Sequence, residues 1–179
     1  MSIITNPVGA SPGRVTSGTT TDGQNSEFSL GTRGYGPDGA EYIYVQAAAA
    51  LMAATTDPNA LAIDENYQAS LMTTALALNN YELGFAPQAV IADNDFFWAR
   101  IAGAKFNARV SASAAADTYL RTTVTAGRLG TASTASAVTF TGVVIVTAAS
   151  ASTSANNSVR EALAVKGRAV RQGVSTLIS

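Results

Sequence analysis

The side chains that most often carry out catalysis are scarce in this chain. Its 179 residues include no histidine and no cysteine, which excludes an imidazole general base, a thiolate nucleophile and a disulfide framework. A serine nucleophile would then need lysine as its base. The two lysines, Lys105 and Lys166, lie in no Ser-x-x-Lys pattern. The composition therefore predicts a protein that is not an enzyme.

Two short acidic runs resemble metal or acid–base sites only in part. Residues 93–95 (Asp-Asn-Asp) carry oxygen ligands, but the glycine of a calcium loop is missing and Phe96 follows at once. Asp64 and Glu65 are adjacent, so on a strand they would point to opposite faces. We interpret both runs as turns, and we expect no metal and no cofactor.

A glycine-rich stretch and an aromatic run remain. Residues 31–36 (Gly-Thr-Arg-Gly-Tyr-Gly) follow no predicted strand and precede no Lys-Ser/Thr pair, so they do not predict a phosphate-binding loop. Trp98 and the phenylalanines before it form either a hydrophobic core, which we favour, or a platform on which sugars or bases stack. No RNP, helix-turn-helix or zinc-finger pattern is present and the pI is about 5.3, so we expect no nucleic-acid partner.

The elements that must position these residues fall into three segments. Residues 1–39 are rich in Gly, Ser, Thr, Pro and Asn, and cannot alone bury enough apolar surface to offset the entropy of ordering. We expect either an extended or flexible N-terminal arm here, which orders on contact with another surface, or a terminus that is merely disordered. Residues 40–166 form the expected β-rich domain, and residues 167–179 form a C-terminal tail.

Aromatic and β-branched residues predict short strands within this domain. These are residues 41–46, 61–64, 95–101, 105–110, 119–125, 128–129 and 138–147. Residues 95–110 predict a hairpin around Gly103, with Phe96, Trp98 and Arg100 on one face and Phe97, Ala99 and Ile101 on the other. A second hairpin turns at Gly127, and Gly142 marks either a bulge or a point of close approach.

Four segments fit more than one kind of secondary structure. Residues 83–91 fit an irregular or edge strand, because Pro87 cannot donate a hydrogen bond to a central ladder. Residues 47–54, 70–78 and 158–165 each fit either helix or strand. The predicted fold is mainly β: a compact antiparallel β-barrel or sandwich with an extended N-terminal arm and at most short helices.

Charge and hydropathy limit the kinds of partner that this chain is expected to bind. Charged residues make up 13% of the chain, about half the usual ~25%. Two basic and ten acidic residues precede Arg100, and nine basic and two acidic residues lie from Arg100 onward. Either the two halves neutralise each other within one fold, which we favour, or an acidic face of one subunit meets a basic face of its neighbour.

The most apolar window, residues 45–54, is about half the ~20 residues of a membrane span. With no signal peptide at the start, we expect cytoplasmic synthesis and no membrane partner.

The order of these motifs from Glu41 to about Arg168 resembles that of capsid decoration (cement) proteins of tailed bacteriophages. The resemblance rests on residues 42–45 (Tyr-Ile-Tyr-Val), 84–91, 97–103, 119–129 and 142–149. It implies a small β-domain that binds the outer surface of an assembled head, often as a trimer, and stabilises it against internal pressure. The arm before Glu41 is longer than such a domain requires, and we expect it to clamp a neighbouring subunit.

Two hypotheses follow. The first is a structural protein on the capsid surface of the virion that binds the major capsid protein as a homo-oligomer, with a trimer favoured. The second is a fibre or tail-tip module that binds a receptor or glycan through the region of Trp98. The candidate interface residues are Arg14, Phe28, Arg33, Tyr35, Trp98, Arg100, Arg109 and Arg128.

Overall fold

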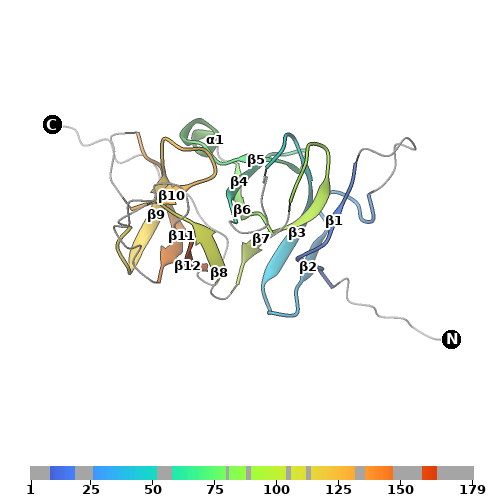
Figure 1. The fold of residues 1–179 in the computed structure, drawn as a ribbon, viewed down its shortest axis with the longest axis horizontal. Helices are drawn as coiled ribbons and strands as arrows, with labels where there is room; N and C mark the ends of the chain where they lie inside the picture. Colours follow the sequence, from blue (N-terminus) through green and yellow to red (C-terminus); the bar gives the residue numbers. More distant parts are fainter. Residues whose placement is uncertain are drawn as a thin grey trace.

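The computed structural model describes residues 9–18, 26–51, 58–79, 81–87, 90–103, 106–111, 114–131 and 136–146, together with the backbone of 159–164 (Figure 1). This part of the chain is mainly β, as predicted, with a single short helix, α1 (Thr74–Leu78). The strands are β1 (Val15–Thr16), β2 (Arg33–Tyr35), β3 (Glu41–Ala47), β4 (Ala60–Ile63), β5 (Gln68–Leu71), β6 (Glu82–Phe85), β7 (Phe96–Ala102), β8 (Phe106–Arg109), β9 (Thr118–Thr122), β10 (Leu129–Gly130), β11 (Thr139–Ile145) and β12 (Val159–Ala164).

The first sheet closes into a barrel. Its strand order is β1-β7-β6-β4-β5-β3-β2, and an additional pairing of β7 with β3 joins β3, β5, β4, β6 and β7 into a ring. The β3–β5 pair is parallel and the other pairs of the ring are antiparallel. The prediction of a compact β-barrel is thus confirmed.

Alternation along β3 and β7 divides their side chains between two cores. Ile43, Val45, Phe97 and Ala99 point into the barrel, where each is buried. Successive strand residues point to opposite faces, so the residues between them lie on the outer face. The predicted division of β7 into two faces is therefore confirmed.

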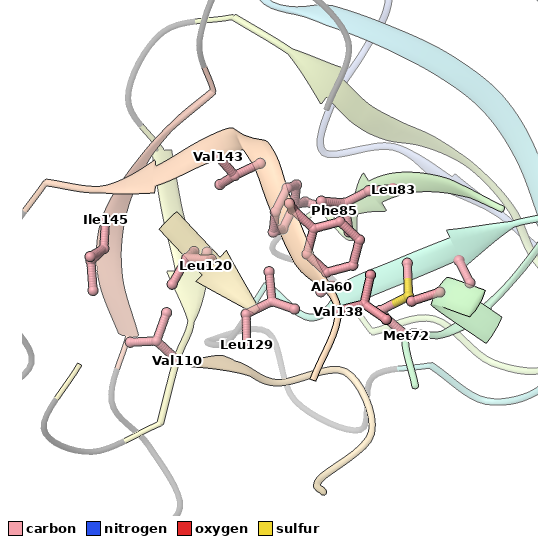
Figure 2. Packing of buried hydrophobic residues seen from close by; sticks show 14 of the residues in the cluster. Ala60, Met72, Leu83, Phe85, Val110, Leu120, Leu129, Val138, Val143 and Ile145 are labelled. Atoms are coloured by element: carbon pink, nitrogen blue, oxygen red, sulfur yellow. The ribbon is translucent and has the colours of Figure 1, made fainter. Parts of the chain in front are cut away.

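The outer face of the opposite barrel wall is covered by the second sheet, of order β10-β9-β11-β12-β8. Val110, directly after β8, bridges to Leu129 of β10 and brings the two outermost strands together. Figure 2 shows the core that results: side chains of β4 and β6 face those of β9, β10 and β11. Both sides of β4 are buried in this way, which explains its continuous apolar sequence, Ala-Leu-Ala-Ile.

The predicted hairpin of residues 95–110 is wrong, because its two strands belong to different sheets. One edge of β7 pairs with β3, and its other edge pairs with β1 and β6. β8 pairs instead with β12. The apolar side chains of Ala108 and Val110 are buried in the core between the second sheet and the barrel. The apolar face of β8 is therefore covered without pairing to β7.

The remaining local predictions concern a second hairpin, a glycine in β11 and the strand that contains Gly84. β9 and β10 form the predicted hairpin, and the register of β11 against β9 shifts between Phe140 and Val144, the stretch that contains Gly142. β6 is not an edge strand, since β4 and β7 flank it; Pro87 lies beyond its end and removes no ladder bond. A Cβ on Gly84 would lie 2.8 Å from the Ile63 Cδ1, so the glycine permits close packing inside the barrel.

The three ambiguous segments are resolved only where the structure describes them. β3 extends through Ala47, whereas residues 52–54 lie outside the described part. Residues 70–78 contain the end of β5 and then α1, whose cap is the Thr73 hydroxyl accepting a hydrogen bond from the Leu76 N–H. Residues 159–164 are a strand. The predicted C-terminal tail, residues 167–179, lies outside the described residues.

The described part of residues 1–39 lies on the barrel instead of standing apart as an arm. β1 pairs with β7, and β2 pairs with β3. Phe28 and Leu30 pack on the outer face of β3 and β7, because that face carries aromatic side chains that need cover. The boundary expected between residues 39 and 40 consequently falls inside the β2–β3 hairpin, where Gly36 donates to the Ala40 carbonyl.

Candidate functional site

An aromatic cluster lies between the N-terminal segment and the barrel. It consists of Tyr44, Phe96 and Trp98 on the strands and Phe28 from the segment above them. Phe28 lies 5.3 Å from the ring of Tyr44 and 5.1 Å from that of Trp98, distances typical of stabilising aromatic pairs. Trp98 is only 2% exposed. The core interpretation of Trp98 is therefore confirmed, and its ring offers no stacking surface in this structure.

Three polar side chains meet on the same outer face of β3 and β7, two residues farther along each strand from Tyr44 and Trp98. Tyr42 and Arg100 are partners in the β3–β7 ladder. Asp38, in the β2–β3 turn, joins them: its Oδ2 accepts a hydrogen bond from the Tyr42 hydroxyl at 2.9 Å and lies 3.1 Å from Nη1 of Arg100. The Asp38 Oδ1 also accepts from the Ala40 N–H. This carboxylate thus fastens the turn to the barrel.

The pKa values of this group follow from its contacts. Burial opposes the charge of Asp38, but the Ala40 N–H, the Tyr42 hydroxyl and the Arg100 charge together lower its pKa. Burial, followed by the hydrogen bond to Asp38, raises the pKa of Tyr42 to about 12. At neutral pH the group therefore consists of a carboxylate, a neutral phenol and a guanidinium.

Arg100 also stacks on aromatic rings. Its guanidinium carbon lies 4.7 Å from the centre of the Phe106 ring and 5.9 Å from that of Tyr42, within the range of cation–π attraction. Phe106 in turn packs edge-on against Phe85 at 4.6 Å. The charge is thus held in one orientation where β6, β7 and β8 meet.

These side chains line a pocket of about 290 Å³, which we call the arginine pocket. Its polar lining includes Arg100, Tyr42 and Asn107. Phe85 and Phe106 form apolar walls, and three prolines, Pro12, Pro58 and Pro87, line it together with small residues. The pocket therefore combines contributions from the N-terminal segment, the barrel and the second sheet.

A second charged group, of one arginine and two glutamates, links the β2–β3 hairpin to β6. Nη1 of Arg33 donates to Glu41 at 3.1 Å, and Nη2 donates to both carboxylate oxygens of Glu82 at 3.1 and 3.0 Å. Burial works against the charge of Arg33, but the hydrogen bonds and charges of the two glutamates outweigh it and raise its pKa. Arg33 consequently ties β2 to β3 and β6.

The remaining candidate residues differ in their contacts and exposure. Arg14 forms an ion pair with Glu27. Arg109 donates to the buried Asn59 Oδ1 at 3.3 Å. The carbonyl of Arg128 accepts from the Thr123 hydroxyl, and Tyr35 is 69% exposed on β2.

The structure brings only part of the predicted interface together. Phe28 and Trp98 touch in the aromatic cluster, whereas the candidate arginines are engaged with different partners. Among the described residues, three of the four ion pairs join residues that precede Arg100, and the Asp38–Arg100 pair crosses between the two halves of the sequence.

Sequence reasoning missed the pocket residues Tyr42, Phe106 and Asn107. The alternation of β3 and β7 could have placed Tyr42 and Arg100 on one face, but their pairing depends on the ladder register. Phe106 and Asn107 approach Arg100 only because β8 crosses into the second sheet, which no local pattern indicates.

The two acidic runs are turns, as interpreted. Asp64 accepts hydrogen bonds from the N–H groups of Asn66 and Gln68, and Asp95 accepts from that of Ala92. Within the described ranges, no group of three or more acidic residues gathers as metal ligands would.

No helix in the described part of the chain is long and apolar enough to cross a membrane. Comparison with protein-family models, curated protein sequences and solved structures finds no match to this chain.

Proposed function

We propose that this chain is a structural virion protein that binds the outside of a phage capsid and stabilises the shell. The observation that supports it best is the use of the candidate residues: Arg33, Arg100 and Phe28 fasten the N-terminal segment, barrel and second sheet to each other. Such a preorganised body loses little conformational entropy when it binds another surface. The resemblance of the order of motifs to that of decoration proteins also favours the proposal.

The physical basis of the stabilisation is mass action. A protein that binds the assembled shell but not the free subunits lowers the free energy of the assembled state relative to that of the free subunits. Many weakly charged contacts, repeated over the shell, add to this effect without any chemical step. We propose that the major capsid protein is the partner, and that the chain acts as a homo-oligomer, with a trimer favoured.

The test is co-sedimentation of the purified chain with undecorated capsids. Saturable binding at a fixed ratio to the major capsid protein is the expected result, together with capsids that survive to a higher temperature. Absence of saturable binding, alongside binding to a glycan array, would reject the proposal in favour of a fibre or tail-tip module. Light scattering of the free and released protein measures its oligomeric state.

Tyr35 provides a sharper probe of the interface. Its aromatic side chain lies on the surface and is 69% exposed. It can therefore contact a partner while the domain stays folded. Tyr35→Ser is expected to weaken capsid binding by about tenfold, as loss of an interfacial tyrosine does. Tyr119→Ser, at a 47% exposed tyrosine on β9, is the matched control and should bind like the wild type.

A further inference from the structure

The turn between β2 and β3 contains the dipeptide Asp38-Gly39, a chemically labile sequence. The glycine nitrogen can attack the Cγ carbon of the aspartate, because glycine has no side chain to hinder the approach. The attack forms a bond from this nitrogen to Cγ and expels the carboxyl O–H and the amide proton as water, which leaves a succinimide ring. Water then adds to either carbonyl of the ring and gives aspartate or isoaspartate, so the net reaction is an isomerisation.

The surroundings of Gly39 leave room for this reaction. A Cβ on Gly39 would meet no atom within 4 Å, and its φ of +74° is one that other residues rarely adopt. The Asp38 side chain is 40% exposed, so water can reach a succinimide formed there. Neither steric cover nor exclusion of water therefore protects this peptide bond.

Hydrogen bonds hold both reacting groups in the folded chain. The Gly39 N–H donates to the Gly36 carbonyl at 3.0 Å, which engages the nitrogen that would attack. The Asp38 Oδ1 accepts from the Ala40 N–H at 3.1 Å, and Oδ2 accepts from the Tyr42 hydroxyl at 2.9 Å. Neither carboxylate oxygen can leave as water unless one of these contacts breaks.

The loss of water also requires the neutral carboxyl group, whereas the surroundings of Asp38 favour the anion. Nη1 of Arg100 lies 3.1 Å from Oδ2. Burial opposes the negative charge, but the Ala40 N–H, the Tyr42 hydroxyl and the Arg100 charge outweigh it and lower the pKa of Asp38. The reactive neutral form is consequently rarer in the folded chain than in an unfolded one.

We propose that Asp38-Gly39 is an isomerisation site that the folded chain keeps inactive through the hydrogen bonds of the Asp38 carboxylate and the Gly39 N–H. Isoaspartate would add one methylene to the main chain of the turn and shorten the side chain. Its carboxylate would then no longer lie against Tyr42 and Arg100, and the β2–β3 turn would lose its attachment to the barrel. The proposal concerns the lifetime of the fold and is independent of the proposed function.

The experiment incubates the full chain in slightly acidic buffer at body temperature for several weeks and measures isoaspartate at Asp38. Endoproteinase Glu-C releases residues 28–41, in which Asp38 is the only aspartate, and the other Asp-Gly pair, residues 22–23, falls in another fragment. Electron-transfer fragmentation distinguishes isoaspartate from aspartate. The reference is the blocked peptide of residues 36–41, Ac-Gly-Pro-Asp-Gly-Ala-Glu-amide. We expect the wild type to isomerise about a hundredfold more slowly than the peptide, since each of the two hydrogen bonds to the carboxylate corresponds to about a factor of ten.

Three variants separate the contacts of the turn from the stability of the domain. Tyr42→Phe removes the hydroxyl that donates to Asp38 and should accelerate isomerisation about tenfold. Tyr119→Phe removes a hydroxyl from a 47% exposed tyrosine on β9 and should leave the rate unchanged. Leu120→Ala, at a buried position in the second sheet, destabilises the whole domain without changing the turn. Thermal melts by circular dichroism verify that each variant folds.

A wild type that isomerises at the rate of the peptide would overturn the proposal, and this comparison holds whether or not Tyr42→Phe folds. Equal rates in Tyr42→Phe and Tyr119→Phe would overturn it too, because the contact with Asp38 would then give no protection. A larger acceleration in Leu120→Ala than in Tyr42→Phe would assign the protection to global stability and reject the local mechanism. Acceleration in Tyr42→Phe that exceeds that in the other two variants supports it.

Discussion

At the scale of single residues, Asp38 shows how one side chain joins two elements. Its carboxylate receives the Tyr42 hydroxyl, the Ala40 N–H and the charge of Arg100. These contacts favour the ionised form over the neutral one, and so lower the pKa of Asp38 in the folded state. Folding is therefore linked to the protonation of this group.

This linkage predicts a pH-dependent effect of Asp38→Asn. Because the folded pKa is lowered from 3.8, the stabilisation is complete above that value and is lost as the pH falls through the folded pKa. We expect the wild type to exceed Asp38→Asn in unfolding free energy near neutral pH, with a difference that shrinks below about pH 4. Urea unfolding at several pH values measures this. A difference that is constant with pH would contradict the linkage. The effect should weaken in salt, since Asp38 is 40% exposed.

Glycine conformation gives a second prediction at this scale. Gly103 has φ +122°, and a Cβ there would lie 2.6 Å from Cα of Ala40. Gly39 has φ +74° but open space around it, and Gly13 has neither constraint. Gly103→Ala should therefore destabilise by more than ~2 kcal/mol and Gly39→Ala by about 1 kcal/mol. Gly13→Ala should be neutral or slightly stabilising.

Chemical denaturation of the three glycine variants measures their order. If Gly103→Ala were no more destabilised than Gly39→Ala, the close approach of Gly103 to Ala40 would not be a constraint. If Gly39→Ala were as stable as Gly13→Ala, the positive φ would carry no cost.

At the scale of elements, β2 is held by few backbone pairs and depends on its side chains. It is three residues long and pairs with β3. Arg33 extends this hold across to β6 by its contacts with Glu82, while it also binds Glu41. The three side chains remain roughly 26–31% exposed, so solvent and salt screen their attraction in part.

Arg33→Met is expected to lower the unfolding free energy by about 1 kcal/mol, because it removes both ion pairs and leaves two glutamates close together. The loss should be smaller at 1 M salt. A double-mutant cycle with Glu82→Gln isolates the pair, and a coupling energy near zero would show that the contact adds nothing. Arg14→Met is the matched control, since Arg14 is 64% exposed and, within the described residues, forms an ion pair with Glu27.

At the scale of the whole molecule, the two sheets share one core. Ala60 and Phe85 of the barrel are buried in the same cluster as Leu120 and Val143 of the second sheet. Removing either sheet would expose apolar surface on the other. Unfolding of the two sheets should therefore be cooperative.

Leu120→Ala tests this coupling. Leu120 is fully buried in the second sheet, so truncation should cost about 2–5 kcal/mol. The single tryptophan, Trp98, lies in the barrel, and its fluorescence reports on that part. We expect fluorescence and circular dichroism to shift together to lower denaturant. A fluorescence transition that stays at the wild-type midpoint would show independent unfolding. Val124→Ala, at a fully exposed position on the same hairpin, should change stability by less than about 0.5 kcal/mol.

The sequence by itself determined features that depend on one segment at a time. The strands at residues 41–46 and 95–101 and the two faces of β7 followed from residue type and a period of two, which is a property of a single extended chain. The same reasoning placed Trp98 in a core. It also identified the acidic runs as turns, since carboxylates there bond to nearby backbone N–H groups.

Only the tertiary structure decided which elements meet. β7 pairs with β3 and not with β8, and Phe28 covers the outer face of the barrel. These outcomes depend on which apolar faces remain to be covered once the ring of strands has closed, and that is a property of the whole chain. The arginine pocket arises in the same way, because Phe106 reaches Tyr42 and Arg100, which pair within the barrel, only when the two sheets pack.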